Sequence, residues 1–342
     1  MKGKVKGAAA ALQWFAQAEQ MLEVHAPQIN RLNVFPVPDS DTGSNMLATI
    51  RACREAVEEA AGARQSDAEE DLGRLLSLAG SRAMGEACGN SGTLLAVLIS
   101  GFAEPLHGSS RLTVEGLSRA LDRASLRAWS ALSAPVDGTM LSVLDAVRDA
   151  AHNETAAAQE PDSRAALEAA MPQLVVAARE ALVRTEQQLP VLTRAQVVDS
   201  GGLGLLLVLA ALAATVRGEN PMQYVQDDLL TGLSGWAAAG EEPRAGASGA
   251  PSSVEPSTAD GSLSGVEIMS TVRLDPLGAA SLRHRLDELG EAVIITPIGA
   301  EAEVDGSLRW RIHVHAQDEQ AVLEAISAAG AVESSAVTPL GS

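Results

Sequence analysis

The sequence predicts an all-α domain over residues 1–220 and a smaller α+β domain over residues 265–338, joined by a flexible linker at 221–264. Three observations lead to this division. In the first part, apolar residues recur at steps of three and four, as on one face of a helix. From about residue 238 the composition shifts to Gly, Ala, Ser and Pro, with little to bury. After residue 264 the apolar pattern changes to a period of two, which is typical of strands.

The first domain is expected to consist of consecutive helices. A stripe of apolar residues after residue 42 marks an amphipathic helix, and a capping box of Ser66 with Glu69 opens the next one. The run 92–102 is apolar on all sides and predicts a buried helix. Thr113 is placed to cap the following helix, which ends before Pro135. Further helices are expected at 139–152, 164–186 and 203–216.

The sequence pattern of the second domain predicts the order strand, helix, strand, strand, helix, strand. Strands are expected at 266–274, 292–298, 308–315 and 332–338, with helices opening at Asp275-Pro276 and spanning 318–330. This order is that of the ferredoxin-like split βαβ fold.

Composition excludes several classes of function. The chain has 342 residues and a formal charge of -19, so its surface repels nucleic acid and no nucleic-acid partner is expected. The two cysteines, Cys53 and Cys88, form no disulfide framework, which favours a reducing, cytoplasmic setting. The longest apolar segment, 203–216, is shorter than the ~20 residues that span a bilayer. No transmembrane segment is expected, and this segment predicts a buried helix.

The stretch "VFPVPDSDTGSNM" (34–46) carries the strongest chemical signal. Pro36 and Pro38 stiffen the chain just before Asp39 and Asp41. Two carboxylates this close repel each other unless a cation lies between them. Hard oxygen ligands in a rigid loop suit Mg²⁺, which prefers one or two carboxylates together with phosphate oxygens and water.

Polar, glycine-containing segments precede three of the expected apolar helices. The residues are Thr42, Gly43, Ser44 and Asn45 at the first; Asn90 and Ser91 at the second; and Asp199, Ser200 and Gly201 at the third. Free N–H groups at a helix start attract anions, so three such starts predict one phosphate-binding rim where these helices converge. The alternative is that these residues are ordinary turns and N-caps, for which Asp, Ser, Gly and Asn are common.

The motifs "LNVFPVPDSDTGSNM", "GNSG", "PVDGTM" and "VVDSGGLGLL", in this order within residues 8–218, resemble DhaL-type kinase domains of the fatty-acid kinase branch. The resemblance implies an antiparallel eight-helix barrel that binds ATP with two Mg²⁺ ions. It implies catalytic and magnesium-binding roles for Asp39 and Asp41, with Asn33 as a further metal position. The nucleotide would be held by Thr42, Gly43, Ser44, Asn45, Asn90, Ser91, Thr139, Met140, Arg184, Asp199, Ser200 and Gly201. For Arg184 and Met140, an exposed helix arginine and a core methionine are the alternatives.

The region 265–330 resembles the middle domain of the bacterial fatty-acid kinase subunit. His313 and His315 lie two apart on an expected strand and so share a face. In the resembling family such a pair joins a cysteine to hold zinc; here Glu267 takes the matching position, and His₂Glu is an acceptable zinc set. The alternative is a solvated strand face. The resemblance also leads us to expect a homodimer.

Three features depart from the family pattern. Ser40 replaces the usual glycine between the two aspartates, which costs strain if that residue needs a positive φ. Cys88 stands where an arginine commonly precedes "GNSG". The family's further C-terminal domain is expected to be absent.

The function implied is ATP-dependent phosphorylation of a fatty-acid carboxylate that a DegV-like lipid-binding partner presents. Such a carboxylate is already ionised at neutral pH, so no general base is required. Two alternatives stay open: a dihydroxyacetone (glycerone) kinase-like phosphotransfer subunit, and a nucleotide-binding regulatory protein without turnover.

Overall fold

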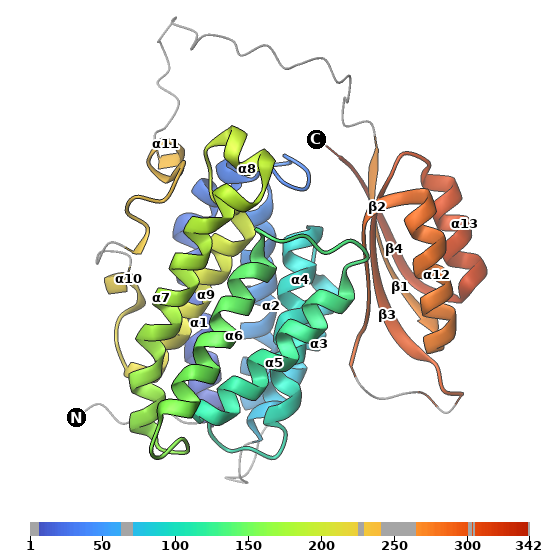
Figure 1. Cartoon of the computed structure of the whole chain (residues 1–342). Helices are drawn as coiled ribbons and strands as arrows, with labels where there is room; N and C mark the ends of the chain where they lie inside the picture. Colours follow the sequence, from blue (N-terminus) through green and yellow to red (C-terminus); the bar gives the residue numbers. More distant parts are fainter. Residues whose placement is uncertain are drawn as a thin grey trace, which may run out of the picture.

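A computed structural model describes residues 7–62, 71–224, 229–240, 265–299, 303 and 305–340. Figure 1 shows a bundle of long helices beside a single sheet, whose far face is covered by two helices. The expectation of an all-α domain followed by an α+β domain is confirmed.

Among the residues that the structure describes, eight helices of fifteen or more residues build the first domain. They are α1 (Gly7–Leu32), α2 (Thr42–Gly62), α3 (Leu72–Glu86), α4 (Gly89–Ala103), α5 (Val114–Ala131), α6 (Met140–Ala157), α7 (Arg164–Gln188) and α9 (Ser200–Arg217). Shorter helices are the 3-10 turn η1 (Glu104–Leu106), α8 (Pro190–Ala195), α10 (Pro221–Tyr224) and α11 (Trp236–Gly240). The residues Ser66 and Glu69 lie outside the described part of the chain, and the helix that follows them begins at Leu72 with Asp71 as its N-cap.

The long helices close into a barrel. Each of α1 to α7 packs on the next, α7 packs on α9, and α9 returns to α1. Among the described helices, only α9 is long and apolar enough to cross a membrane, yet 83% of that window is buried inside the protein. It therefore occupies the position of a core helix.

The C-terminal domain has the expected ferredoxin-like topology. Its elements are β1 (Val266–Leu274), α12 (Pro276–Leu289), β2 (Gly290–Pro297), β3 (Leu308–Ala316), α13 (Glu319–Ala329) and β4 (Ala331–Pro339). The four strands lie in the order β2-β3-β1-β4 and every neighbouring pair is antiparallel. Asp275 caps α12 by accepting a hydrogen bond from the Gly278 N–H at 2.7 Å, as the Asp-Pro pair predicts.

The two faces of this sheet differ in character. Ile268, Ile312 and Val314 belong to the apolar core shared with α12 and α13. On the opposite face of β3, Arg311, His313 and His315 are buried, whereas Arg309 near the start of the strand is exposed. A buried polar face needs partners, and the helical barrel supplies them.

Contacts at β2 join the two domains. Ile294 belongs to the apolar core of the barrel and forms an isolated antiparallel bridge with Leu132. The Ser133 N–H donates to the Val293 carbonyl at 3.1 Å. Arg283 on α12 donates to the Ser130 carbonyl at 2.9 Å and to the Ile295 carbonyl at 2.6 Å. The sheet is thus docked on the barrel through backbone pairing as well as side chains.

The expected linker at 221–264 is in part structured. Residues 229–240 lie against the barrel, because Leu229, Leu230 and Leu233 are buried in its core. The three leucines bury apolar area against the barrel, which the Gly-, Ala-, Ser- and Pro-rich composition of the linker did not predict. Residues 241–264 lie outside the described part of the chain.

Candidate functional site

The first residues of three barrel helices meet, as the sequence predicts. Thr42 begins α2, Ser91 lies in the first turn of α4, and Ser200 begins α9. The Thr42 hydroxyl lies 3.4 Å from the Ser91 hydroxyl. The Ser200 hydroxyl donates to the Thr42 hydroxyl at 3.3 Å. We call these three helix starts, with the preceding loop 33–41, the helix-start site.

The loop 33–41 holds two carboxylates in a partly buried place. Burial, with the neighbouring Asp41 carboxylate as the second cause, raises the pKa of Asp39 to about 7. Asn33, itself buried, donates from its side-chain nitrogen to Asp39. Ser40 between the aspartates has a φ of 58°, the left-handed region that glycine adopts without strain. The Phe35–Pro36 peptide bond is cis.

Asp199 links the starts of α9 and α6. It is the N-cap of α9 and accepts from the Gly202 N–H at 2.6 Å. Its carboxylate also accepts from the Met140 N–H, the first of α6. Burial raises the pKa of Asp199 to about 6, since both hydrogen bonds only partly offset the loss of water.

A cavity of about 350 Å³ lies between the barrel and the sheet. Of the expected nucleotide residues, those that line it are Asn90, Ser91, Thr139, Met140, Asp199 and Gly201. Apolar side chains from the loop at 35–37, from α4 and from the segment 132–136 add to its wall. The remaining wall comes from the second domain, through residues 291–293 and His315.

The structure corrects the expectation for the α2 start. The Gly43 and Ser44 amides, which the sequence leaves free for an anion, instead donate to the Asn30 side-chain oxygen at 2.7 and 3.2 Å. The Asn45 N–H donates to the carbonyl of Asp41, the residue that precedes α2. Asn30 lies on α1, so no local sequence motif predicts that it caps the start of α2.

For two residues to which the resemblance assigns nucleotide binding, Arg184 and Met140, the sequence also allowed a purely structural role. Arg184 is exposed on α7 and is not among the described residues that line the cavity. Met140 is 3% exposed and packs near Gly201, but it also lines the cavity. Residues 291–293 of the second domain line the cavity although the sequence did not predict a place for them in this site. Their contribution depends on domain docking, for which the chain carries no pattern.

Several buried polar atoms around the helix-start site have no hydrogen-bond partner in the described structure. They are the side-chain oxygens of Asn33 and Asn90 and the side-chain nitrogen of Asn45. Unpaired buried polar atoms are costly, so such a group in a native site points to a ligand, an ion or a water. Together with two mutually repelling aspartates, this donor set fits a hard cation with its anionic ligand.

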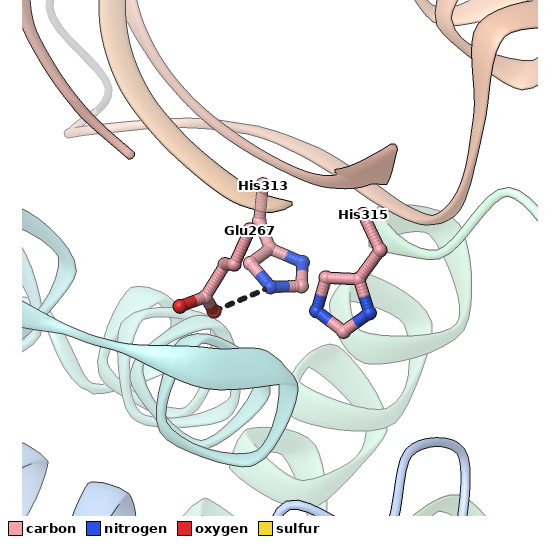
Figure 2. Close-up of side chains that lie close together, drawn as sticks. All are labelled: Glu267, His313 and His315. Atoms are coloured by element: carbon pink, nitrogen blue, oxygen red, sulfur yellow. Dashed lines mark hydrogen bonds and ion pairs between the residues drawn. The ribbon is translucent and has the colours of Figure 1, made fainter. Parts of the chain in front are cut away.

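A second cluster lies on the sheet face that meets the barrel. Figure 2 shows Glu267, His313 and His315 projecting together from the strands toward the barrel helices. Their ligand atoms all lie within 4.8 Å of one another, and His313 Nε2 is 2.8 Å from Glu267 Oε1. The alternative of a solvated strand face is excluded, because both histidines are buried.

The environment of this cluster resembles that of metal-ligating histidines. His313 Nδ1 lies 3.0 Å from the Ala292 carbonyl, and such a bond orients a histidine whose other nitrogen binds metal. His315 Nδ1 is buried without a partner, and burial lowers the pKa of His315 to about 4, which keeps the ring neutral. Burial opposes ionisation of Glu267, but the hydrogen bond from His313 and the other favourable contacts of the carboxylate together outweigh it and lower the pKa of Glu267.

Comparison with known proteins defines the class of the barrel. The DAK2 domain family matches residues 36–214. An uncharacterized protein of Staphylococcus saprophyticus is 35% identical over 203 residues, which cover 59% of this chain and 34% of that protein. Protein YloV of Bacillus subtilis is 35% identical over 204 residues, covering 60% and 34%. A crystal structure of the native dihydroxyacetone kinase of C. freundii aligns with a TM-score of 0.40 and 21% identity, covering 63% of this chain and 36% of that one.

The family match spans more than half of the chain. The chain therefore belongs to the DAK2 domain family, and the resemblance to DhaL-type kinase domains is confirmed. The chain spans about a third of the length of the curated relatives that it matches.

Proposed function

We propose that the protein is an ATP-dependent phosphotransferase whose nucleotide lies at the helix-start site. The observation that carries the proposal is the meeting of Thr42, Ser91 and Ser200 beside the paired aspartates. Hydroxyl groups can donate hydrogen bonds to phosphate oxygens, and the paired aspartates suit the metal that accompanies phosphates.

Asp39 and Asp41 are the residues that would hold Mg²⁺, with Asn33 adjacent through its unpaired side-chain oxygen. Bound there, Mg²⁺ would neutralise charge on the phosphate oxygens. The hydroxyls of Thr42, Ser91 and Ser200 converge from three helices and are placed to orient the phosphates. Asp199 aligns α9 with α6 through its two backbone hydrogen bonds. Residues 291–293 and His315 of the second domain cover the cavity on one side.

The acceptor that we favour is a fatty-acid carboxylate presented by a DegV-like partner. A carboxylate is ionised at neutral pH, and so the site needs no general base. The motif "NVFPVPD" favours this over the glycerone kinase-like alternative. A regulatory protein without turnover remains the competing class, motivated by Ser40 and Cys88. A homodimer and a cytoplasmic location belong to the same proposal.

Zinc at Glu267, His313 and His315 is a further part of the proposal. The two imidazoles and the carboxylate suit a His₂Glu site, and the bond to the Ala292 carbonyl fixes the ring of His313. When bound, zinc would supply a structural link between β1 and β3.

Titration calorimetry with Mg-ATP tests the nucleotide site. The wild-type chain should bind, and Asp39→Ala should weaken metal-dependent binding by about tenfold or more, since hydrogen bonds and charges of this kind are worth ~1.5–3 kcal/mol. Asp162→Ala, which removes the same charge from an exposed turn, is the matched control. Equal affinities for Asp39→Ala and wild type would count against the site. A phosphoryl-transfer assay then distinguishes the two enzyme hypotheses, with a fatty-acid-loaded lipid-binding protein or dihydroxyacetone as the acceptor. Nucleotide binding without turnover would favour the hypothesis of a regulatory protein.

A further inference from the structure

Arg311 on β3 is buried at the contact between the two domains. Its side chain is 8% exposed, and burial lowers the pKa of its guanidinium. The charge is costly to bury unless specific contacts compensate it. One guanidinium nitrogen donates to the Thr271 hydroxyl on β1 at 3.2 Å, and another crosses to the barrel and donates to the Ala87 carbonyl at 3.0 Å.

Ala87 belongs to the turn between α3 and α4, which we call the 87–89 turn. The Ala87 N–H completes α3 by bonding to Ala83, so its carbonyl is left to face the second domain. Cys88 is the N-cap of α4 but makes no side-chain capping bond. The start of α4 thus lacks a cap from its own sequence, although its first N–H groups need acceptors.

The second domain supplies that acceptor. The Glu267 carboxylate accepts a hydrogen bond from the Gly89 N–H, the first residue of α4. Arg311 therefore holds the carbonyl at one end of the 87–89 turn, and Glu267 holds the amide at the other end. Both bonds come from neighbouring strands of one sheet.

The turn is confined on its other side by α2. Gly89 has a φ of 62°, and a Cβ built on it would lie 2.2 Å from the Asn45 side-chain nitrogen. A shift of the turn therefore moves α4 against the helix that begins at Thr42. Asn90 and Ser91, which line the cavity, follow directly after the turn.

We propose that Arg311 is a positioning residue for the helix-start site, acting from the second domain through the 87–89 turn. The inference rests on the proposed function, because it concerns where Asn90 and Ser91 stand relative to a bound nucleotide. Without the guanidinium the turn samples other arrangements, and apparent affinity falls with the fraction of molecules in the competent one.

The test combines hydrogen exchange with nucleotide binding in the full chain. Arg311→Gln should speed amide exchange at 87–91 and weaken Mg-ATP binding by about tenfold, the effect of losing one charged hydrogen bond. Arg309→Gln is the matched control: it removes the same charge from the same strand, where the side chain is exposed and pairs with Glu333. It should leave exchange at 87–91 and affinity unchanged. Should Arg311→Gln fail to fold, Arg311→Lys, which keeps the charge with a single donor nitrogen, is measured in the same way.

The outcomes are separable from those of the proposed function. Unchanged exchange at 87–91 overturns the inference whether or not nucleotide binds. Faster exchange with unchanged affinity overturns it as well, because the turn then has no bearing on the site. A wild-type chain that does not bind Mg-ATP refutes the proposed function, and with it the positioning role, even where the exchange result shows the contact.

Discussion

The paired aspartates predict an unusual pH dependence of stability in the metal-free protein. The pKa of Asp39 is about 7 in the fold and 3.8 in the absence of structure. Below about pH 4 the carboxyl is protonated in both states. Between about pH 4 and 7 the unfolded chain loses this proton while the fold retains it, so the free energy of unfolding falls as pH rises. Above about pH 7 both states are ionised and the loss is complete.

The size of this loss follows from the pKa difference. At about 1.4 kcal/mol per pH unit the full difference corresponds to ~4 kcal/mol. Asp39 is only half-buried, so solvent screening reduces the value to ~2 kcal/mol. Asp39→Asn removes the ionisation, and its Tm should exceed that of wild type by roughly 4 to 8 °C above pH 7.

Thermal unfolding in EDTA, from pH 4 to 8, measures the difference. The gap in Tm between Asp39→Asn and wild type should grow from near zero at pH 4, while Asp162→Asn, an exposed control, should show none. Asp199 also titrates in this range, but equally in both proteins, and so it cancels. Excess Mg²⁺ at pH 8 should raise the Tm of wild type and narrow the gap. A gap that does not change with pH would refute the reasoning.

Two further predictions concern single features of the structure. Ser40→Gly should raise the Tm by about 2 °C, because a left-handed residue with a Cβ costs ~1 kcal/mol; Ser44→Gly, a glycine placed in a helix, is the control and should lower it. Equal shifts would exclude strain at residue 40. The zinc site predicts about one zinc ion per chain after incubation and dialysis, measured by elemental analysis, and His315→Ala should lose it. Retention of the same zinc content by that variant would remove His315 from the site.

Local patterns predicted the elements of this protein well. The strand expected at 266–274 begins and ends where β1 does, and its alternating apolar residues pack into the core of the second domain. The convergence of three helix starts was likewise predictable, since polar glycine-containing caps precede apolar helices. The capping of the Gly43 and Ser44 amides was not predictable, because Asn30, whose side-chain oxygen accepts from both, lies on another helix. A side chain that approaches from a distant element leaves no periodic signal.

The polar face of the sheet shows why the two domains form one unit. Alternation along β3 places Arg311, His313 and His315 on a common side, but it does not say whether water or protein covers them. An uncovered face would solvate these groups at little cost, whereas here all three are buried. Burial is tolerable because the barrel offers the Ala87 carbonyl and the Gly89 amide, two groups that the α3–α4 turn leaves without partners of its own. Each domain therefore satisfies polar groups that the other buries, and the shared turn leads directly into the residues that line the cavity.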